Sequence, residues 1–173
     1  MNKHLKHAVL AVLVITTLAI GNAYAGTASS NLSVSANVSA DCSINATAMG
    51  FGTYDPVSAN SSTGVDVQST ANLFVGCTNG AAATITLDQG QNPSGASNPD
   101  QPVRQMTNGS GFLTYFLYQD SEHTTVWGGT TDSGQAYLGT GSGSTLTVYG
   151  VTPRGQNVPT GTYNDLVVAT ISF

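Results

Sequence analysis

Residues 32–42 read Leu-Ser-Val-Ser-Ala-Asn-Val-Ser-Ala-Asp-Cys, and apolar side chains alternate with polar ones along this stretch. The apolar side chains stand on the even positions Leu32, Val34, Ala36, Val38 and Ala40. Because successive side chains of a β-strand point to opposite sides, a period of two predicts a strand with one apolar and one polar face. The stretch therefore indicates an all-β fold and provides its first candidate strand.

Short runs of the same kind recur along the chain. They are Val65–Val67, Asn72–Cys77, Thr84–Leu87, Phe112–Tyr118, Thr124–Trp127, Thr145–Val151 and Tyr163–Phe173. Clusters of Gly, Asn and Ser separate them, and these residues accept the backbone conformations of tight turns at little cost. Many short strands with such turns predict a sandwich or a barrel, and no helical period is visible beyond residue 25.

The first residues have the pattern of a secretory signal peptide. Lys3 and Lys6 precede an apolar run over residues 8–20, and Ala23-Tyr24-Ala25 follows it. A transmembrane anchor is the alternative, but spanning a bilayer needs roughly 20 apolar residues, and a small-x-small tripeptide suits cleavage after Ala25. We therefore expect an exported protein with a signal peptide over 1–25, an N-terminal extension over 26–40 and one domain over 41–173.

The composition excludes some partners. Beyond the expected cleavage site the only cations are Arg104 and Arg154, against nine acidic residues in the whole chain. Such an acidic chain is not expected to bind nucleic acid. Charged residues make up 8% of the sequence, against about 25% in a typical domain, so we expect a neutral surface rich in hydroxyl groups.

The only two cysteines are Cys42 and Cys77. Two cysteines in an exported chain most often pair in an oxidising compartment, and two buried thiols are the alternative. A zinc site would need four ligands, whereas His123 is the only histidine beyond the signal peptide. We expect neither a metal nor another cofactor.

The C-terminal stretch indicates an incomplete sandwich. Tyr163 in Pro159-Thr160-Gly161-Thr162-Tyr163 has the setting of the tyrosine corner of immunoglobulin-like sandwiches, where strand F begins. An ordinary buried tyrosine is the alternative. The odd positions after it are apolar and are expected to face the core: Val167, Ala169, Ile171 and Phe173. The chain then ends, one strand short of the complete fold, which would have a strand G.

A sandwich without strand G would expose an apolar groove and an unpaired edge, both of which favour aggregation. Leu32, Val34, Ala36 and Val38 form a suitable insert, and strand F with its four odd positions would border the groove. Insertion into the same subunit would need the chain to reverse within the few residues from Val38 to Cys42, so we favour insertion into a neighbour. Such head-to-tail contacts do not close, and they produce a fibre.

The order of several motifs resembles the spore coat protein U domain family, which includes the major subunits of archaic chaperone–usher pili of the Csu type. The matching segments are Val38–Cys42, Phe51–Pro56, Val75–Cys77, Arg104–Met106, Leu113–Asp120, Trp127–Gly128 and Gly161–Asp165, with Phe173 at the end. The resemblance implies an immunoglobulin-like fold lacking strand G, a Cys42–Cys77 bridge and polymerisation by donor-strand exchange. It also implies a periplasmic chaperone and an outer-membrane usher as partners, with no small-molecule substrate.

We therefore expect a structural rod subunit of a surface pilus that supports attachment and biofilm formation. No catalytic residue is assigned. Asp120, Glu122 and Asp132 lie in loop-like sequence, and His123 is expected in a solvated hairpin loop. Asp165 is expected to face inward as a structural hydrogen-bond partner.

The alternative function is a secreted glycan-binding module. Trp127, Tyr118 and Tyr137 would then form a platform on which sugar rings stack, and the opposing interpretation is that these rings pack in the core or between subunits. A two-domain chain would be expected of a tip adhesin, which favours a rod subunit here.

Overall fold

The computed structural model describes residues 25–173, so most of the predicted signal peptide lies outside the described residues. Residues 25–36 belong to a unit separate from residues 37–173, which form the folded domain. Eight strands and no helix are present in the described part of the chain, so no helix there is long and apolar enough to cross a membrane. The strands are β1 (Cys42–Ala46), β2 (Val67–Cys77), β3 (Ala82–Leu87), β4 (Arg104–Thr107), β5 (Phe112–Tyr118), β6 (Gln135–Leu138), β7 (Gly143–Thr152) and β8 (Ala169–Ser172).

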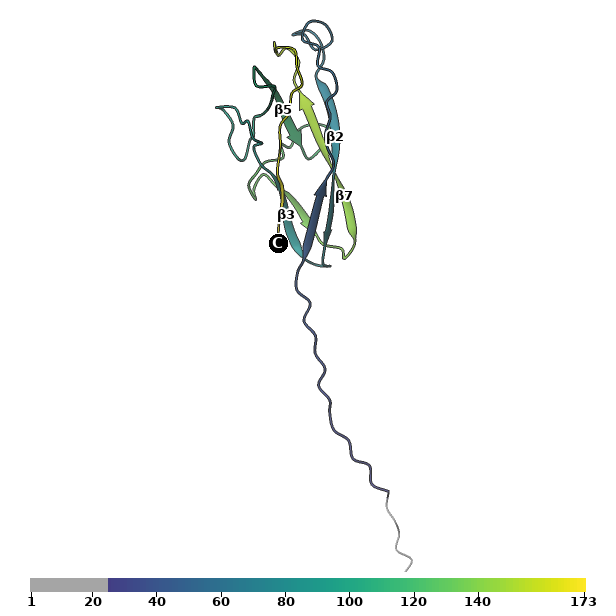
Figure 1. The fold of residues 1–173 in the computed structure, drawn as a ribbon. Helices are drawn as coiled ribbons and strands as arrows, with labels where there is room; N and C mark the ends of the chain where they lie inside the picture. The colour runs from purple at the N-terminus through teal and green to yellow at the C-terminus, as the bar shows by residue number, and fades with distance from the viewer. Residues whose placement is uncertain (1–24) are drawn as a thin grey trace, which may run out of the picture. The chain divides into compact units, whose positions relative to one another are not determined.

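The strands form two antiparallel sheets that pack face to face. The five-stranded sheet has the order β1-β2-β7-β5-β4, and the three-stranded sheet has the order β6-β3-β8. The long strands β2 and β7 lie side by side along the sandwich (Figure 1). In the order of an immunoglobulin-like sandwich, β1-β2-β7-β5 take the places of strands A-B-E-D, and β3-β8 take those of strands C-F. The short strands β4 and β6 are additional edge strands. The fold is the expected immunoglobulin-like sandwich, with the place of strand G beside β8 empty among residues 25–173.

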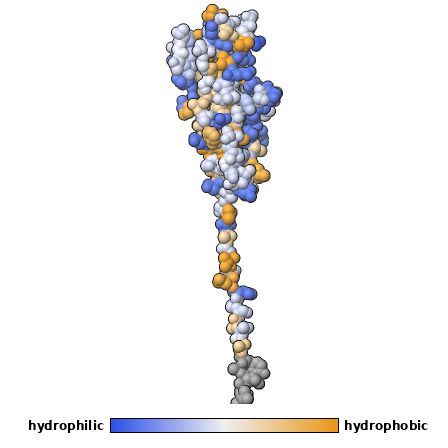
Figure 2. Space-filling view, turned by 90° about the vertical axis from the view of Figure 1, so that its right-hand side faces the viewer, coloured by the Kyte–Doolittle hydropathy of each residue, from blue (hydrophilic) through white to orange (hydrophobic). Residues whose placement is uncertain are grey.

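Every second side chain along the strands points inward, and these side chains form the core between the two sheets. In β5 the odd positions Leu113, Tyr115 and Leu117 are buried, and the even positions point outward. The same alternation buries Leu73 and Val75 on β2. Charged residues make up 8% of the sequence, and on the face shown in Figure 2 pale areas of intermediate hydropathy and blue hydrophilic areas surround the orange apolar patches. The low charged fraction therefore corresponds to a surface that interacts with water mainly through neutral polar groups.

The predicted strands agree in part with the observed ones. The run Phe112–Tyr118 is confirmed with its bounds, and the two runs at 65–67 and 72–77 belong mostly to the single strand β2. The four-residue strands β4 and β6 were missed. Both are short and mix polar with apolar residues, so their period carries little signal.

Two predicted strands need correction. The run Thr124–Trp127 is a loop with one isolated bridge between Tyr118 and Val126. Its apolar signal comes from Trp127, which packs into the core from a loop. The last strand begins at Ala169 and not at Tyr163, because the residues before it form no continuous ladder. Asn164 makes an isolated bridge to Thr107 at the end of β4, and Asp165 bonds to the loop at Gln91.

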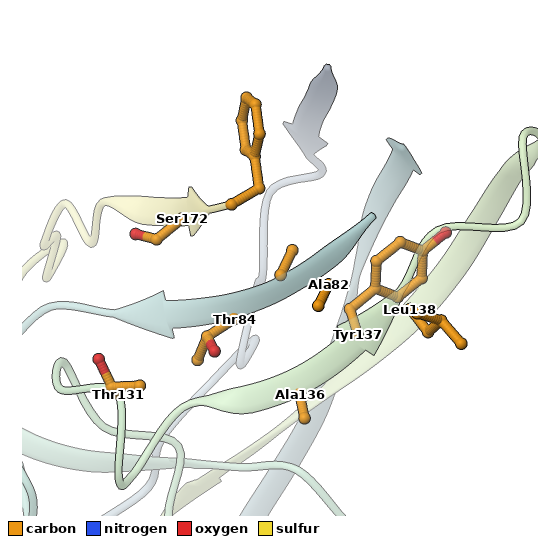
Figure 3. A pocket seen from close by; sticks show the side chains of 9 residues that line it. Ala82, Thr84, Thr131, Ala136, Tyr137, Leu138 and Ser172 are labelled. Carbon is orange, nitrogen blue, oxygen red and sulfur yellow. The ribbon is translucent and has the colours of Figure 1, made fainter. Parts of the chain in front are cut away.

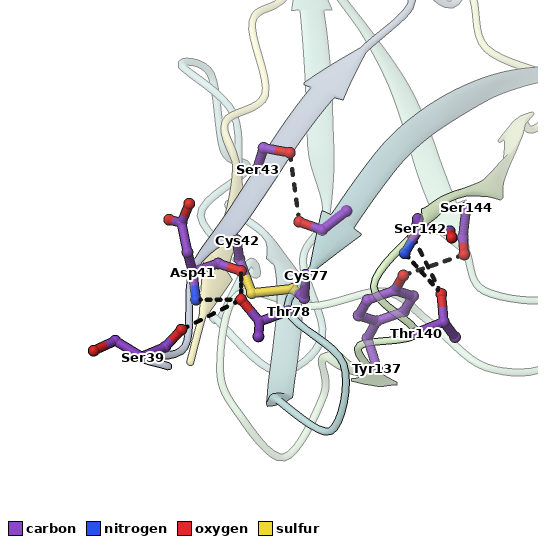
Figure 4. The surroundings of a disulfide bond; sticks show 11 residues. Ser39, Asp41, Cys42, Ser43, Cys77, Thr78, Tyr137, Thr140, Ser142 and Ser144 are labelled. Atoms are coloured by element: carbon purple, nitrogen blue, oxygen red, sulfur yellow. Dashed lines mark hydrogen bonds between the residues drawn. A yellow bond between two sulfur atoms is a disulfide. The ribbon is translucent and has the colours of Figure 1, made fainter. Parts of the chain in front are cut away.

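The sandwich has two distinct ends. At one end the Cys42–Cys77 disulfide joins β1 to β2, which confirms the predicted bridge (Figure 4). At the other end Val67 of β2 pairs with Thr152 of β7. We call these the disulfide end and the distal end; the distal end includes the loops 53–66 and 153–162.

Candidate strand-acceptor groove

Two strand edges are free on the same side of the sandwich. Among the described residues β1 pairs only with β2, and β8 pairs only with β3. β1 and β8 belong to different sheets, yet some of their Cα atoms lie within 8 Å of each other. No backbone hydrogen bonds are found between them. A further strand between these two edges would find unpaired N–H and C=O groups on either side.

The side chains beside these edges are apolar and only half covered. They pack against the core cluster but remain partly accessible, from Ile44, Met49 and Phe51 on the β1 side and from Val167, Ala169 and Ile171 on the β8 side. Three of the four residues predicted to border the groove thus share one inward face. Phe173, the fourth, is 59% exposed.

A groove of about 500 Å³ opens toward the distal end. Its walls come from two segments without regular strand structure, Met49–Tyr54 after β1 and Val158–Asn164 before β8, and Met106 and Leu113 also line it. This role of the segment after β1 was not predicted from the sequence, although Phe51–Pro56 is part of the family motif. Met49 and Phe51 are apolar and two positions apart, which is a strand-like spacing, but they stand on odd positions, out of step with Cys42 and Ile44 of β1.

Tyr163 lies in the wall of this groove. Its hydroxyl group donates a 2.8 Å hydrogen bond to the carbonyl oxygen of Pro159, four residues upstream. This is the kind of bond to nearby backbone that the tyrosine-corner interpretation expects. The bond holds the loop before β8 in a tight arch beside the opening.

Asp165 supports the segment that leads into β8. Its carboxylate accepts hydrogen bonds from the backbone N–H of Gln91, from the side-chain amide of Asn92 and from the hydroxyl of Tyr115 at 2.7 Å. Burial, followed by this bond to Asp165, raises the pKa of the Tyr115 hydroxyl. Asp165 faces inward as a structural partner, as the sequence suggested.

The alternating N-terminal segment forms no strand within residues 25–41. Its large apolar side chains are exposed: Leu32 at 88%, Val34 at 83% and Val38 at 81%. Exposed apolar side chains on alternate positions are costly to leave in water, and a partner strand position would cover them. No strand among the described residues pairs with this segment, and its register in any groove is not assigned.

The last residues before β1 are tied to the domain. Thr78 accepts a hydrogen bond from the backbone N–H of Asp41 at 3.1 Å through its hydroxyl oxygen, and its own N–H donates to the carbonyl oxygen of Asp41 at 2.9 Å. The Thr78 hydroxyl also lies 3.4 Å from the carbonyl oxygen of Ser39 (Figure 4). Thr78 therefore holds the start of the domain at the disulfide end, a role that nothing in its sequence neighbourhood signalled.

The profile of the Spore Coat Protein U domain matches residues 28–170 of this sequence. The chain belongs to the Spore Coat Protein U domain family. It is 48% identical over 176 residues to Protein U of Myxococcus xanthus, and the match covers 98% of each chain. The resemblance inferred from the motif order is thereby confirmed at the level of the family.

A solved structure shares the fold of this Spore Coat Protein U domain. It is a crystal structure of the CsuC–CsuE chaperone–tip adhesion subunit pre-assembly complex from archaic chaperone–usher Csu pili of Acinetobacter baumannii. The TM-score is 0.51 at 24% sequence identity, and the match covers 79% of this chain. This chain spans 40% of the length of the matched chain.

A second hollow lies on the outer face of the three-stranded sheet, with a volume of about 750 Å³. Thr84 of β3 stands there between Ala136 of β6 and Ser172 of β8, and these small side chains form the floor (Figure 3). Phe173 also lines this hollow. The C-terminal residue thus lies where it can contact the outer face, and its part in the groove stays a prediction.

Three of the residues considered for catalysis, Asp120, Glu122 and His123, lie in the loop after β5, where the contacts of Asp120 and His123 hold the loop. His123 lies in the hairpin loop after β5, and its ring packs between Tyr118 and Tyr149 at centroid distances of 5.2 and 6.4 Å. Asp120 accepts hydrogen bonds from Thr124 and Thr125, which closes the same loop. Within residues 25–173 no three His, Cys, Asp or Glu side chains are grouped so as to hold a metal ion.

The sugar-stacking platform is contradicted by the position of Trp127. Its side chain is 0% exposed, and its indole N–H donates a 2.8 Å hydrogen bond to the carbonyl oxygen of Ile85. Tyr118 lies on the five-stranded sheet and Tyr137 on the three-stranded sheet, so the three rings do not share a surface. Trp127 has the role of a core residue instead.

Proposed function

We propose that this chain is a structural subunit of a fibre in which residues 30–39 of each copy are inserted beside β8 of a neighbouring copy. One observation carries the proposal: the free edges of β1 and β8 flank half-buried apolar side chains. Leu32, Val34, Ala36 and Val38 would supply the missing apolar face, and their backbone would add a strand to the sheet. The function is assembly, and no catalytic residue is assigned.

The attachment of the segment favours a neighbour over the same copy. Asp41 is bonded to Thr78 at the disulfide end, and β1 begins one residue later. A donor lying between β1 and β8 of its own domain would have to reverse direction within the residues between Val38 and Cys42. Insertion into another copy needs no reversal, and repetition of this contact generates an open fibre.

The same groove accounts for the proposed partners. A subunit with an open apolar groove tends to aggregate before assembly, so a chaperone that lends a strand would protect it during export. The CsuC–CsuE structure, which shares this fold, is a chaperone–subunit complex by its name. We therefore include a periplasmic chaperone, an outer-membrane usher and export to the cell surface in the proposal.

Deletion of residues 30–39 tests the proposal. The deleted segment contains all four proposed inserted side chains, whereas deletion of residues 26–29 removes a neighbouring stretch of the same extension and serves as the control. We expect the 30–39 deletion to remain monomeric or chaperone-bound, while the control forms fibres visible by electron microscopy. Long, detergent-resistant fibres from the 30–39 deletion would refute donor-strand assembly through this segment.

The assembled subunits could form either of two structures on the cell, a pilus rod or a coat layer. A pilus rod supporting attachment and biofilm formation is favoured by the shared fold with the Csu complex. A coat layer is favoured by the name of the family and by the 48% identity to Protein U. Immunogold electron microscopy on intact cells separates them, because pili extend from the surface as labelled filaments and a coat is labelled as a continuous layer.

A further inference from the structure

The direction of β8 determines where an inserted strand leaves the groove. Ala169 pairs with Leu87 and Ser172 pairs with Thr84, so β8 runs from the distal end toward the disulfide end. In an immunoglobulin-like sandwich strand G is antiparallel to strand F. An inserted segment therefore runs toward the distal end, and Val38 of the donor copy lies there. This step rests on the proposed function.

Few residues then separate the donor strand from its own domain. Asp41 follows Val38 by three positions and is bonded to Thr78 at 3.1 Å and 2.9 Å. The Asp41 side chain itself is exposed. The disulfide end of the donor copy, with this carboxylate, must consequently lie against the distal end of the copy that accepts the strand.

The distal end carries two carboxylates and one cation. Arg154 is bonded to Asp66 by a long contact of 3.9 Å between Nη1 and Oδ1, and the Arg154 side chain is 52% exposed. Asp55 is nearby in the loop 53–66, where its carboxylate accepts hydrogen bonds from the N–H groups of residues 57 and 58. A third carboxylate arriving at this end would be repelled by the other two unless a cation stood between them.

Arg154 is the cation available for this contact. Residues 7–173 contain no lysine, and Arg104, the other arginine, is fully buried. We propose that Arg154 of the accepting copy binds the Asp41 carboxylate of the donor copy, which makes the two ends of the domain a complementary pair. The partner of this surface is therefore a second copy of the same chain.

The test uses Arg154→Lys, which introduces the only lysine side chain in residues 7–173. Fibres of this variant are treated with a carbodiimide, which joins amines only to carboxylates in direct contact, and linked peptides are identified by mass spectrometry. We expect a link between positions 154 and 41. Within one chain these positions lie at opposite ends of β2, which is about 30 Å long, so the link is intermolecular.

The control is the same variant carrying Val34→Asp, which is expected to stay monomeric and to form no 154–41 link. Fibres whose only links from position 154 run to Asp66 or Asp55 would overturn the inferred contact and leave donor-strand assembly intact. Failure of the unsubstituted chain to form fibres would overturn both.

A second test exchanges the charges at positions 154 and 41 and measures the rate of fibre formation. Arg154→Glu places four carboxylates and no cation at the junction, and it should slow fibre formation about two- to fivefold, as expected for the loss of one exposed ion pair. Asp41→Arg in the same chain should restore the rate, since the pair is present again with reversed signs. A double variant that is slower than Arg154→Glu alone would contradict the pairing.

Discussion

Arg104 combines full burial with a positive charge. Its guanidinium donates hydrogen bonds to the carbonyl oxygens of Leu87, Asp88 and Trp127 at 2.7 to 2.9 Å, and so links β4 of one sheet to the end of β3 in the other. Burial lowers the pKa of Arg104 to about 10, opposed by nearby Tyr115, Asp88 and Asp165. The side chain is still charged at neutral pH and acts as a clamp across the sandwich.

Replacing Arg104 with Met should therefore destabilise the domain. Three carbonyl oxygens would lose their donor, those of Leu87 and Trp127 in buried bonds and that of Asp88 in a partly buried one. Each buried loss costs about 1–3 kcal/mol. We expect the free energy of unfolding in urea at pH 7 to fall by about 3 kcal/mol or more. Arg104→Lys keeps the charge with fewer correctly placed donors and should show an intermediate loss; equal stability of all three proteins would exclude the clamp.

The Asp120 carboxylate should make the free energy of unfolding depend on pH in the acid range. Hydrogen bonds from Thr124 and Thr125 lower the pKa of its carboxyl group to about 2, below the unfolded value of about 3.9. A lowered pKa in the folded state stabilises the protein above the unfolded pKa, and this contribution disappears as the pH falls through the folded pKa.

The side chain of the variant Asp120→Asn does not ionise, so the variant should lack the contribution of Asp120 to the pH dependence of stability. Its free energy of unfolding should be lower than that of the unsubstituted chain at pH 7, and the difference should shrink between pH 4 and pH 2. Urea unfolding of both proteins at several acid pH values measures this difference in the free energy of unfolding. If the free energies of unfolding of the two proteins changed with pH in parallel, the charged carboxylate of Asp120 would not hold the loop.

At the scale of elements, two edge strands and one extension determine assembly. β1 and β8 offer free edges and half-buried apolar side chains, and residues 32–38 offer an exposed apolar face. The strands β4 and β6 also lie at sheet edges. Only the edges of β1 and β8 approach each other beside half-buried apolar side chains, and we therefore assign these two edges to contacts between copies.

The substitution Val34→Asp separates this face from the rest of the extension. Val34 is 83% exposed in the single chain, so the fold should be unaffected. In the groove a carboxylate would be buried without a partner, at a cost of several kcal/mol. We expect a folded monomer with little or no fibre, measured by sedimentation and electron microscopy.

The matched control is Ser35→Asp, which places the same charge on the opposite face of the same strand. That variant should assemble. Equal fibre yields from the two variants would show that the apolar face is not the inserted one.

At the scale of the molecule, the disulfide lies where the fibre would carry tension. The extension enters the domain through β1, which pairs only with β2 among the described residues, and the Cys42–Cys77 bond joins these two strands at their meeting end. Without it, a pull on the extension would be resisted by one ladder of hydrogen bonds. The bond therefore ties the proposed donor segment covalently to a central strand.

Replacing both cysteines with Ala should lower the free energy of unfolding. The bond closes a loop of 35 residues, for which the chain-entropy relation gives about 3–4 kcal/mol. Urea unfolding of the monomer measures this loss, and thiol labelling of the denatured, unreduced parent should find no free cysteine. Two labelled thiols in the parent, or an unchanged urea midpoint in the variant, would contradict this role.

Several features were predictable because they depend on neighbours in the chain. The alternation in residues 112–118 predicted β5 with its bounds, since burial of every second side chain follows from the geometry of a strand. Trp127 was misread as part of a strand and, in the alternative function, as a surface ring. A large aromatic residue has the same apolar signal in either place, and only its neighbours decide whether it is buried.

The sequence by itself determined the all-β class, the family, the pairing of the only two cysteines and the alternating character of residues 32–40, because each depends on local period, residue identity or motif order. The tertiary structure decided which edges are unpaired, that Trp127 is internal, that Thr78 holds the start of the domain and that Arg154 and Asp41 lie at opposite ends. These features depend on contacts between residues far apart in the chain, and such contacts exist only after the sheets have paired and packed.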